Sequence, residues 1–311
     1  MSSLQRISVI GAGAMGAFYA NKFFDMDPGC VSLIAGGERG ARLRTDGLFV
    51  NGRRCFPSIL TPEEIPVPSD VVMVAVKHHH LPGAIHDLRL AVGEETHILS
   101  VMNGIESEEK LGTAFGMEKV LYAVAVGIDA VREGNTVTCS KQGKLLFGEA
   151  DNSVLSPRVS ALQDLFRRAG LACETPPDMI RALWWKFMIN VGFNQVSAVL
   201  GAPYGIFQSS GVARGLAESA MKEVISVAGA ARVRLSQKDI EDFYPFLQAM
   251  SPEGKTSMVQ DVEAKRKTEV EMFAGKVVEL GRRYRLPTPV NEILLGFIKV
   301  IEERDQWPRR S

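Results

Sequence analysis

A glycine-rich turn directly after a short β-branched run is the feature that most constrains this chain. Ile7–Ile10 leads into Gly11-Ala12-Gly13-Ala14-Met15-Gly16, and a helix-like stretch follows to about Asp25. In such a turn the first glycine permits the tight bend, the second lets backbone N–H groups approach a pyrophosphate, and the third lets helix and strand pack closely. The helix N-terminus adds N–H donors and a positive dipole end. The context predicts a dinucleotide site, with an ordinary strand–helix turn as the alternative.

Strand and helix signals alternate through the first half of the chain. Val31–Ala35, Val71–Val76 and Thr96–Val101 are predicted strands, and Leu81–Leu90 is a predicted helix. The continuous apolar run Val71–Val76 is typical of a strand that is buried on both faces. This alternation predicts an α/β fold, with a Rossmann-type, mostly parallel sheet and helices on both faces.

The pattern changes between Val120 and Pro177. Turn signals such as Glu133-Gly134-Asn135 separate short β-rich pieces that we expect to extend the sheet. Pro176-Pro177 then stops regular structure, so we place the end of the dinucleotide-binding domain, residues 1–177, at this point. The predicted elements of this stretch are strands Val120–Val126, Thr136–Ser140 and Lys144–Phe147, a helix Val154–Ala169 and a strand Ala172–Thr175.

Strand signals almost vanish after Pro177, so residues 178–311 are predicted to form an all-α C-terminal domain. Asp178 is a suitable N-cap for its first helix, and Pro287 and Pro289 fit a break before its last. The predicted helices are Asp178–Leu200, Val212–Ala228, Gln237–Met250, Glu269–Tyr284 and Val290–Glu303.

The overall charge and the cysteines narrow the class of protein. Lys plus Arg equals Asp plus Glu, 36 each, so no net charge draws the chain to nucleic acid or to an anionic membrane. No apolar run is long enough to span a bilayer, and Met1–Arg6 carries no signal-peptide hydrophobic region. None of the four cysteines is at C-x-x-C spacing, which is typical of buried thiols in a reducing compartment. We expect a cytoplasmic protein with neither a nucleic-acid nor a membrane partner.

The end of the second strand bears on which dinucleotide is bound. An NAD site usually has an acidic residue there for the ribose diol, but this strand ends in Ala35-Gly36-Gly37. Arg39 and Arg42 follow closely, and a guanidinium suits a 2′-phosphate through forked, charge-assisted hydrogen bonds. We therefore expect NADP(H), bound in part by Arg39. Glu38 argues against an exclusive preference, and a solvated Arg39 is the alternative.

Three polar residues interrupt an otherwise apolar helix. Lys186, Asn190 and Asn194 recur at i, i+4 and i+8 within Leu183–Asn194, so they line one narrow face. Aromatic residues crowd beside them, where a solvated face would carry charges, and burying such groups without partners costs several kcal/mol. We expect them to face a polar cavity, in which the lysine donates a proton to a carbonyl oxygen. A thin solvent-facing stripe is the alternative.

His78-His79-His80 is the one histidine cluster. Successive side chains diverge on any regular element, and no cysteine or paired carboxylate lies nearby in the sequence to complete a metal site. We expect no metal here, and instead a polar loop at the end of a strand, near the cofactor.

Together, these motifs resemble those of the 2-dehydropantoate 2-reductases, or ketopantoate reductases. The similarity runs in order from residue 7 to about residue 300. Besides the glycine turn and the Lys-x3-Asn-x3-Asn helix, it rests on Lys77 after one buried strand, Asn103-Gly104 after the next, Ser257-Met258-Val259-Gln260-Asp261 and Lys267-Thr268-Glu269. The resemblance implies a Rossmann-type domain, an α-helical domain and a cleft between them. It implies NADPH-dependent reduction of 2-dehydropantoate to (R)-pantoate, a step toward pantothenate and coenzyme A.

The resemblance also implies roles for individual residues. Lys186 would be the general acid on the ketone oxygen, Asn103 would lie between nicotinamide and substrate, and Glu269 would help fix the reacting groups. Asn190, Asn194, Ser257 and the residue at Tyr204 would contact the substrate, and Lys77 and the backbone near Ala130 would contact the cofactor.

Two departures from the family's pattern leave alternatives open. Gly36 stands where the family often has an arginine, and Tyr204 stands where some members have an asparagine that binds substrate. Another 2-keto acid is therefore an alternative substrate. A 3-hydroxyacid dehydrogenase is a second alternative, although residues 123–128 lack its usual glycine-rich loop, and a non-catalytic NADP-binding sensor is a third. A homodimer is left open.

Overall fold

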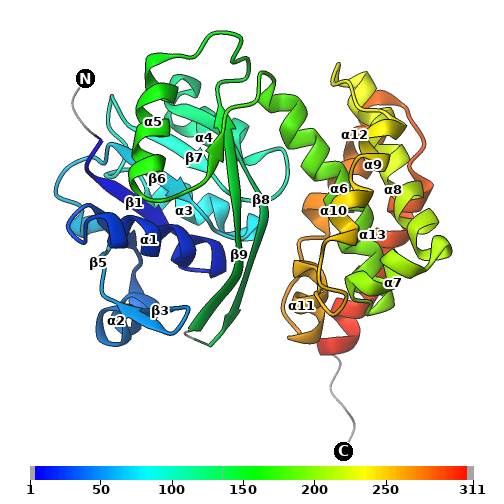
Figure 1. Cartoon of the computed structure of the whole chain (residues 1–311), viewed down its shortest axis with the longest axis horizontal. Coiled ribbons are helices and arrows are strands. Elements are labelled where there is room, and N and C mark those ends of the chain that lie inside the picture. The colour runs from blue at the N-terminus through cyan, green and yellow to red at the C-terminus, as the bar shows by residue number, and fades with distance from the viewer. Residues whose placement is uncertain (1–3, 135, 307–311) are drawn as a thin grey trace, which may run out of the picture. The chain divides into compact units, whose positions relative to one another are not determined.

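The computed structural model describes residues 4–134 and 136–306 (Figure 1). The N-terminal Met1–Ser3 and Asn135 of the predicted turn lie outside the described residues. The chain divides into two compact units, Met1–Leu183 and Trp184–Ser311, and the division falls inside helix α6 (Met179–Leu200). Within the described ranges, every helix is too short or too polar to cross a lipid bilayer.

A parallel sheet forms the core of the first unit. Its strands lie in the order β5-β2-β1-β6-β7-β8. That order is the doubly wound arrangement of dinucleotide-binding folds, and it reverses direction between β1 and β6. The α/β prediction is confirmed. The strands are β1 (Ile7–Ile10), β2 (Val31–Ile34), β5 (Ser58–Leu60), β6 (Val71–Val74), β7 (His97–Ser100) and β8 (Val120–Glu133).

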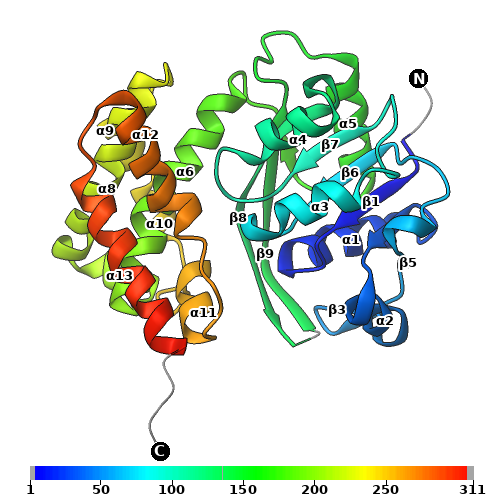
Figure 2. The same cartoon turned by 180° about the vertical axis from the view of Figure 1, so that it is seen from behind.

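Helices cover both faces of this sheet, as Figures 1 and 2 show from opposite sides. Alternate residues of β6 belong to different cores: Met73 packs in the cluster that holds Phe23 and Phe166, whereas Val72 packs in the cluster that holds Leu88. This two-sided burial is why the strand is continuously apolar. On the first face lie α1 (Ala14–Met26) and α5 (Pro157–Arg168), and on the second lie α3 (Leu81–Asp87) and α4 (Ser107–Phe115).

Strand β8 continues past the parallel sheet into a long antiparallel hairpin with β9 (Thr136–Gly148). Two separate strands were predicted where β9 is a single one, so that prediction is wrong. Gly143, between the two predicted strands, takes a left-handed φ of 48° within the ladder, where a Cβ would overlap the backbone of β8. Gly143 lies between the pairs Val126–Lys144 and Ile128–Gln142, so the ladder continues through it and the strand does not end there. Three short strands extend this end: β3 (Leu48–Val50), β4 (Arg53–Cys55) and β10 (Cys173–Glu174).

Several short elements were not predicted. Helix α2 (Gly37–Asp46) begins with glycine and is rich in arginine, so it lacks a clear apolar period. The predicted helix Gln237–Met250 is instead two short helices, because Pro245 lacks the N–H that a continuous helix would need there. Short 3-10 turns are η1 (Pro62–Glu64), η2 (His78–His80) and η3 (Met117–Lys119).

Every regular element that the structure describes after Leu183 is helical, which confirms the prediction of an all-α C-terminal part. Besides α6 these elements are α7 (Tyr204–Ser209), α8 (Gly211–Ala230), α9 (Gln237–Glu241), α10 (Tyr244–Gln248), α11 (Ser257–Glu263), the π-helix η4 (Glu271–Gly275), α12 (Lys276–Tyr284) and α13 (Pro289–Gln306).

Helix α6 is the centre of the second unit. Its Phe187 ring lies 6.4 Å from that of Phe273, and its Phe193 ring lies 5.3 Å from that of Phe207. Its buried Gln195 donates to Asn291 Oδ1 at 3.2 Å. The first turn of the helix belongs to the first unit, where the Asp178 carboxylate accepts from Arg181 N at 2.9 Å, so the predicted N-cap is confirmed.

Candidate functional site

The parallel strands of the first unit end in one row. Ile10 is in register with Ile34 on one side and with Val74 on the other, and Val74 is in register with Ser100. The segments that follow these strands therefore leave the sheet at the same edge, where dinucleotides bind in such folds. The predicted cofactor residues that follow them are Gly11, Ala12, Gly13, Ala14, Met15 and Gly16 after β1, Arg39 after β2, Lys77 after β6 and Asn103 after β7.

The three glycines of the turn meet three different surroundings. Gly11 has a left-handed φ of 96°, and a Cβ there would lie 2.6 Å from Ala75 O. A Cβ on Gly16 would overlap the carbonyl oxygen of Gly11, so the protein itself requires both of these glycines. A Cβ on Gly13 would meet no protein atom within 4 Å. Gly13 is the N-cap of α1, so the space beside it is a cradle at a helix N-terminus that fits a pyrophosphate.

The start of α1 is electrostatically suited to an anion. No acidic residue lies in its first turn, and no side chain caps it. The first N–H groups of a helix have no acceptor within the helix, and they lie at the positive end of its dipole. The residues that are present therefore fit a dinucleotide diphosphate.

A group of arginines adjoins the turn, and one member was missed by the sequence analysis. Arg132 of β8 donates from Nη1 to the carbonyl oxygen of Ala12. Burial, followed by the charges of Arg39 and Arg42, lowers the pKa of Arg132, so the three guanidinium groups lie close enough to interact. No signal in the sequence marks Arg132, because the contact depends on the fold of the β8–β9 hairpin.

The other predicted cofactor residues are Lys77, Asn103 and Ala130, and they follow or lie within different strands of the first unit. Lys77 and Asn103 are partly buried, and each has an interaction within the protein. Lys77 O accepts from His80 N at 2.8 Å, which starts the 3-10 turn of histidines. Ala130 lies directly after a register shift between β8 and β9, at which β9 has one extra residue. In the described part of the chain, no three His, Cys, Asp or Glu side chains are grouped so that they could hold a metal.

A buried carboxyl group, also missed by the sequence analysis, lies behind Asn103. Ser100 donates to Ser107 Oγ at 2.8 Å, and Ser107 donates to Glu108 Oε2 at 2.9 Å. Ser100 Oγ also accepts from Met102 N at 3.3 Å, next to Asn103 in the chain. Glu108 is 1% exposed, its Oε1 lacks a hydrogen-bond partner, and burial raises its pKa to about 7. This chain of hydrogen bonds holds the segment that carries Asn103.

In the second unit, the fold brings Lys186 and Glu269 together. Burial lowers the pKa of the Lys186 amine to about 8, and the charge of Glu269 acts in the opposite direction. Glu269 is 7% exposed and lies two residues before the π-helix. Lys186 is partly buried, and both residues have partners within the protein. A lysine with this pKa is still mostly protonated at neutral pH, yet it gives up its proton more readily than a solvated lysine.

Ser257 lies next to the last polar residue of the α6 stripe. Asn194, which is buried, lies one helical turn beyond Asn190, and its Nδ2 is 3.5 Å from Ser257 Oγ at the start of α11. Tyr204 is placed next to the loop before α11, because Tyr204 N donates to Gly254 O at 2.9 Å and a Cβ on Gly254 would lie 3.1 Å from the tyrosine ring. Asn194 therefore lies beside the start of α11, and Tyr204 lies beside the loop that precedes it.

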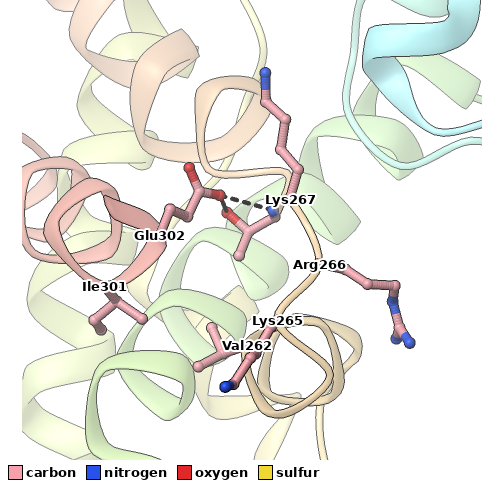
Figure 3. A pocket seen from close by; sticks show the side chains of 7 residues that line it. Val262, Lys265, Arg266, Lys267, Ile301 and Glu302 are labelled. Atoms are coloured by element: carbon pink, nitrogen blue, oxygen red, sulfur yellow. Dashed lines mark hydrogen bonds between the residues drawn. The ribbon is translucent and has the colours of Figure 1, made fainter. Parts of the chain in front are cut away.

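A pocket is lined by residues of α11, of the segment just before Glu269 and of α13 (Figure 3). Glu302 of α13 accepts from Thr268 N at 2.7 Å and from Thr268 Oγ1 at 2.6 Å. The Lys267 side chain points away from this carboxylate in Figure 3. The two hydrogen bonds anchor the residue before Glu269, so they help to fix where the Glu269 carboxylate lies.

Comparison with known proteins gives a consistent result. The model of "Ketopantoate reductase PanE/ApbA" matches residues 7–152, and that of "Ketopantoate reductase PanE/ApbA C terminal" matches residues 178–302. The 2-dehydropantoate 2-reductase of Aquifex aeolicus is 24% identical over 304 residues, which cover 96% of this chain and 97% of the relative.

Solved structures agree with these matches. The 2-dehydropantoate 2-reductase of Geobacter metallireducens is 30% identical with a TM-score of 0.84, and the match covers 95% of this chain and 99% of that one. A D-mandelate dehydrogenase, solved with NADH and anilino(oxo)acetate, has a TM-score of 0.86 at 20% identity and covers 97% of this chain and all (100%) of its own. At 20% identity, the similarity to the D-mandelate dehydrogenase is a similarity of fold.

Proposed function

The chain belongs to the ketopantoate reductase family, and on that premise we propose that it uses NADPH to reduce 2-dehydropantoate to (R)-pantoate. The family is one of oxidoreductases that act on a small keto acid with a nicotinamide cofactor. In this proposal residues 1–177 bind the cofactor, and residues 178–311 supply the groups that act on the substrate. A cytoplasmic location and a homodimer stay predictions.

The observation that carries the proposal is the state of Lys186. Its amine lies on an apolar helix, its pKa is lowered by burial to about 8, and Glu269 favours the charged form. NADPH, held at the glycine turn, would supply a hydride to the C2 carbon of the acid, and negative charge would then develop on the C2 oxygen. Lys186 donates a proton to that oxygen, and assistance of this kind is typically worth ~10²–10⁴ in rate. The negative charge of Glu269 favours the protonated form of Lys186 before the proton is transferred.

The remaining site residues bind and orient. Asn190 and Asn194 hold the hydroxyl and carboxylate of the substrate without adding charge, and Ser257 extends this line from α11. Asn103 would contact the nicotinamide and the substrate, and the hydrogen bonds from Ser100 to Glu108 hold its segment. Tyr204 borders the acid's side chain, so its bulk selects among keto acids.

On the cofactor, residues 11–16 receive the pyrophosphate, with Gly13 leaving the space for it. Lys77 and the backbone at Ala130 contact the dinucleotide, and Arg39 binds the 2′-phosphate. The preference for NADPH rests on the strand end Ala35-Gly36-Gly37, which lacks a carboxylate, and on the arginines of α2.

The test is oxidation of NADPH by the full-length protein against a panel of 2-keto acids that includes 2-dehydropantoate, repeated with NADH. We expect turnover with 2-dehydropantoate and a higher kcat/KM with NADPH than with NADH. If no acid in the panel is reduced, the proposed enzyme activity is wrong. If both cofactors give equal kcat/KM, the NADPH preference is wrong.

A reductase for a different 2-keto acid is the second candidate, and Tyr204 is the observation that favours it. A phenol packed against Gly254 is larger than the amide that some relatives carry at this position. Tyr204→Asn is the matched variant for the same panel. A gain for 2-dehydropantoate together with a loss for another acid would favour the second candidate.

A further inference from the structure

Arg132 contacts the glycine turn although it comes from the β8–β9 hairpin, which lies far from the turn in the sequence. It lies near the end of β8, and its Nη1 donates to the carbonyl oxygen of Ala12, between the first two glycines of the turn. Its Nε donates to Gly134 O at 2.8 Å, which ties the same side chain to the tip of its own hairpin. A guanidinium has five N–H donors in a planar fork, so these two bonds orient the group and need not exhaust it.

Two further arginines approach the same place from α2. This helix starts directly after β2, and β2 pairs with β1 so that Ile34 is opposite Ile10. The turn after β1 and the first residues of α2 therefore leave the sheet side by side. Arg39 and Arg42 are the third and sixth residues of α2. Arg132 contacts the turn, and Arg39 and Arg42 of α2 lie close enough to interact with its charge, although these elements are far apart in the sequence.

The charges of these groups act against one another. Burial and the neighbouring Arg42 lower the pKa of Arg39, and burial followed by the other two arginines lowers the pKa of Arg132. Like charges held together raise the free energy of the folded protein, and a bound anion relieves the repulsion. Phosphate suits such a group because it accepts forked hydrogen bonds from guanidinium.

The position decides which phosphate is involved. The pyrophosphate belongs at the start of α1, and the 2′ position of the adenosine ribose belongs at the end of the second strand, next to α2. We propose that Arg132 is a specificity-determining residue that, together with Arg39 and Arg42, holds the 2′-phosphate of NADP. The proposal rests on the proposed function, since it requires a nicotinamide dinucleotide in this site. It also explains how the site could bind the phosphate with Gly36 at the end of the second strand, where the family often has an arginine. Arginines from α2 and β8 would take the place of that arginine.

The test compares binding of NADPH and NADH to the full-length protein by isothermal titration calorimetry, without substrate. Arg132→Gln should raise the Kd for NADPH by about tenfold or more and leave the Kd for NADH within about threefold, since a charge-assisted bond is worth roughly 1.5–3 kcal/mol. Arg132→Lys keeps the charge but loses the fork, so it should give an intermediate loss. Adenosine 2′,5′-bisphosphate and adenosine 5′-monophosphate should show the same contrast.

Arg6→Gln is the matched control. Arg6 is exposed, pairs with Asp70 and lies before β1, at the opposite end of the strand from the turn, so it should change neither Kd. If Arg132→Gln weakens both cofactors equally, Arg132 supports the turn or the pyrophosphate and the inference is overturned. If neither Kd changes, it is overturned as well. Wild-type protein that binds no dinucleotide would overturn the proposed function too, so the two failures are distinguishable.

Discussion

Replacing Glu108 by glutamine should change how the stability of the first unit depends on pH. The carboxyl is 1% exposed, and burial raises its pKa from 4.5 to about 7, with the Ser107 hydroxyl acting in the opposite direction. Unfolding returns the group to water and to its ordinary pKa. The stability that comes from the protonated form is therefore fully present below pH 4.5 and is lost as the pH rises through about 7. The amide introduced by Glu108→Gln cannot ionise, so the variant escapes this loss.

The magnitude follows from the shift. A difference of 7 − 4.5 = 2.5 pH units at about 1.4 kcal/mol per unit corresponds to roughly 3 to 4 kcal/mol in full, of which roughly 3 kcal/mol develops between pH 4.5 and pH 8. The amide of the variant also leaves one donor without a partner, where Glu108 Oε1 lies now, at a cost that does not depend on pH. The pH-independent cost cancels when the stability difference between variant and wild type is compared at two pH values. The stability of the variant minus that of wild type should rise by roughly 3 kcal/mol between pH 4.5 and pH 8.

The assay is urea unfolding followed by circular dichroism across this pH range. Midpoint and slope are measured for wild type, Glu108→Gln and the control Glu94→Gln, which replaces an exposed carboxyl of the same unit. The control difference should stay flat. A flat difference for Glu108→Gln as well would refute the reasoning, because Glu108 would then titrate alike in the folded and unfolded chain.

Three further predictions concern neighbouring residues. Gly16→Ala should destabilise the protein by about 1–3 kcal/mol, because its Cβ would overlap the Gly11 carbonyl oxygen, and thermal unfolding will show it. Gly13→Ala meets no protein atom within 4 Å, so its unfolding temperature should match that of wild type while the Kd for NADPH rises about tenfold or more; unchanged affinity would mean that no phosphate enters this cradle. Ser107→Ala removes a hydrogen bond that lowers the pKa of Glu108, so the pH at which stability is lost should move upward, and a downward move would contradict the network.

The sequence was informative where structure is local. Ile7–Ile10, the glycine turn and the helix after it are adjacent in the chain, and the side-chain alternation of a two-sided core makes Val71–Val74 continuously apolar. Helix α6 was predicted with its N-cap because Asp178 precedes a long apolar segment. Each of these patterns needs only a few neighbouring residues to be recognised.

The parts that were missed depend on tertiary contacts. Arg132 meets Ala12 only after a hairpin folds beside the sheet, and Glu108 becomes buried only when α4 packs against β7 and β8. A charged residue in a hairpin and an acidic residue in the first turn of a helix look like ordinary solvated residues in a sequence. Likewise, the break expected between the two predicted strands does not occur, because Gly143 continues the β8–β9 ladder in a left-handed conformation that only its approach to the β8 backbone explains.

The central claim is that the Lys186 amine gives the proton that completes hydride transfer to a 2-keto acid. The most direct measurement is the pH profile of NADPH oxidation with 2-dehydropantoate, for wild type and Lys186→Ala, alongside the Kd for NADPH. Because the protonated lysine is the donor, wild-type kcat should be level below pH 8 and fall above it. The variant should lose about 10²-fold or more of kcat while its Kd for NADPH stays unchanged. Wild-type turnover in Lys186→Ala, or a profile without the fall near pH 8, would contradict the account.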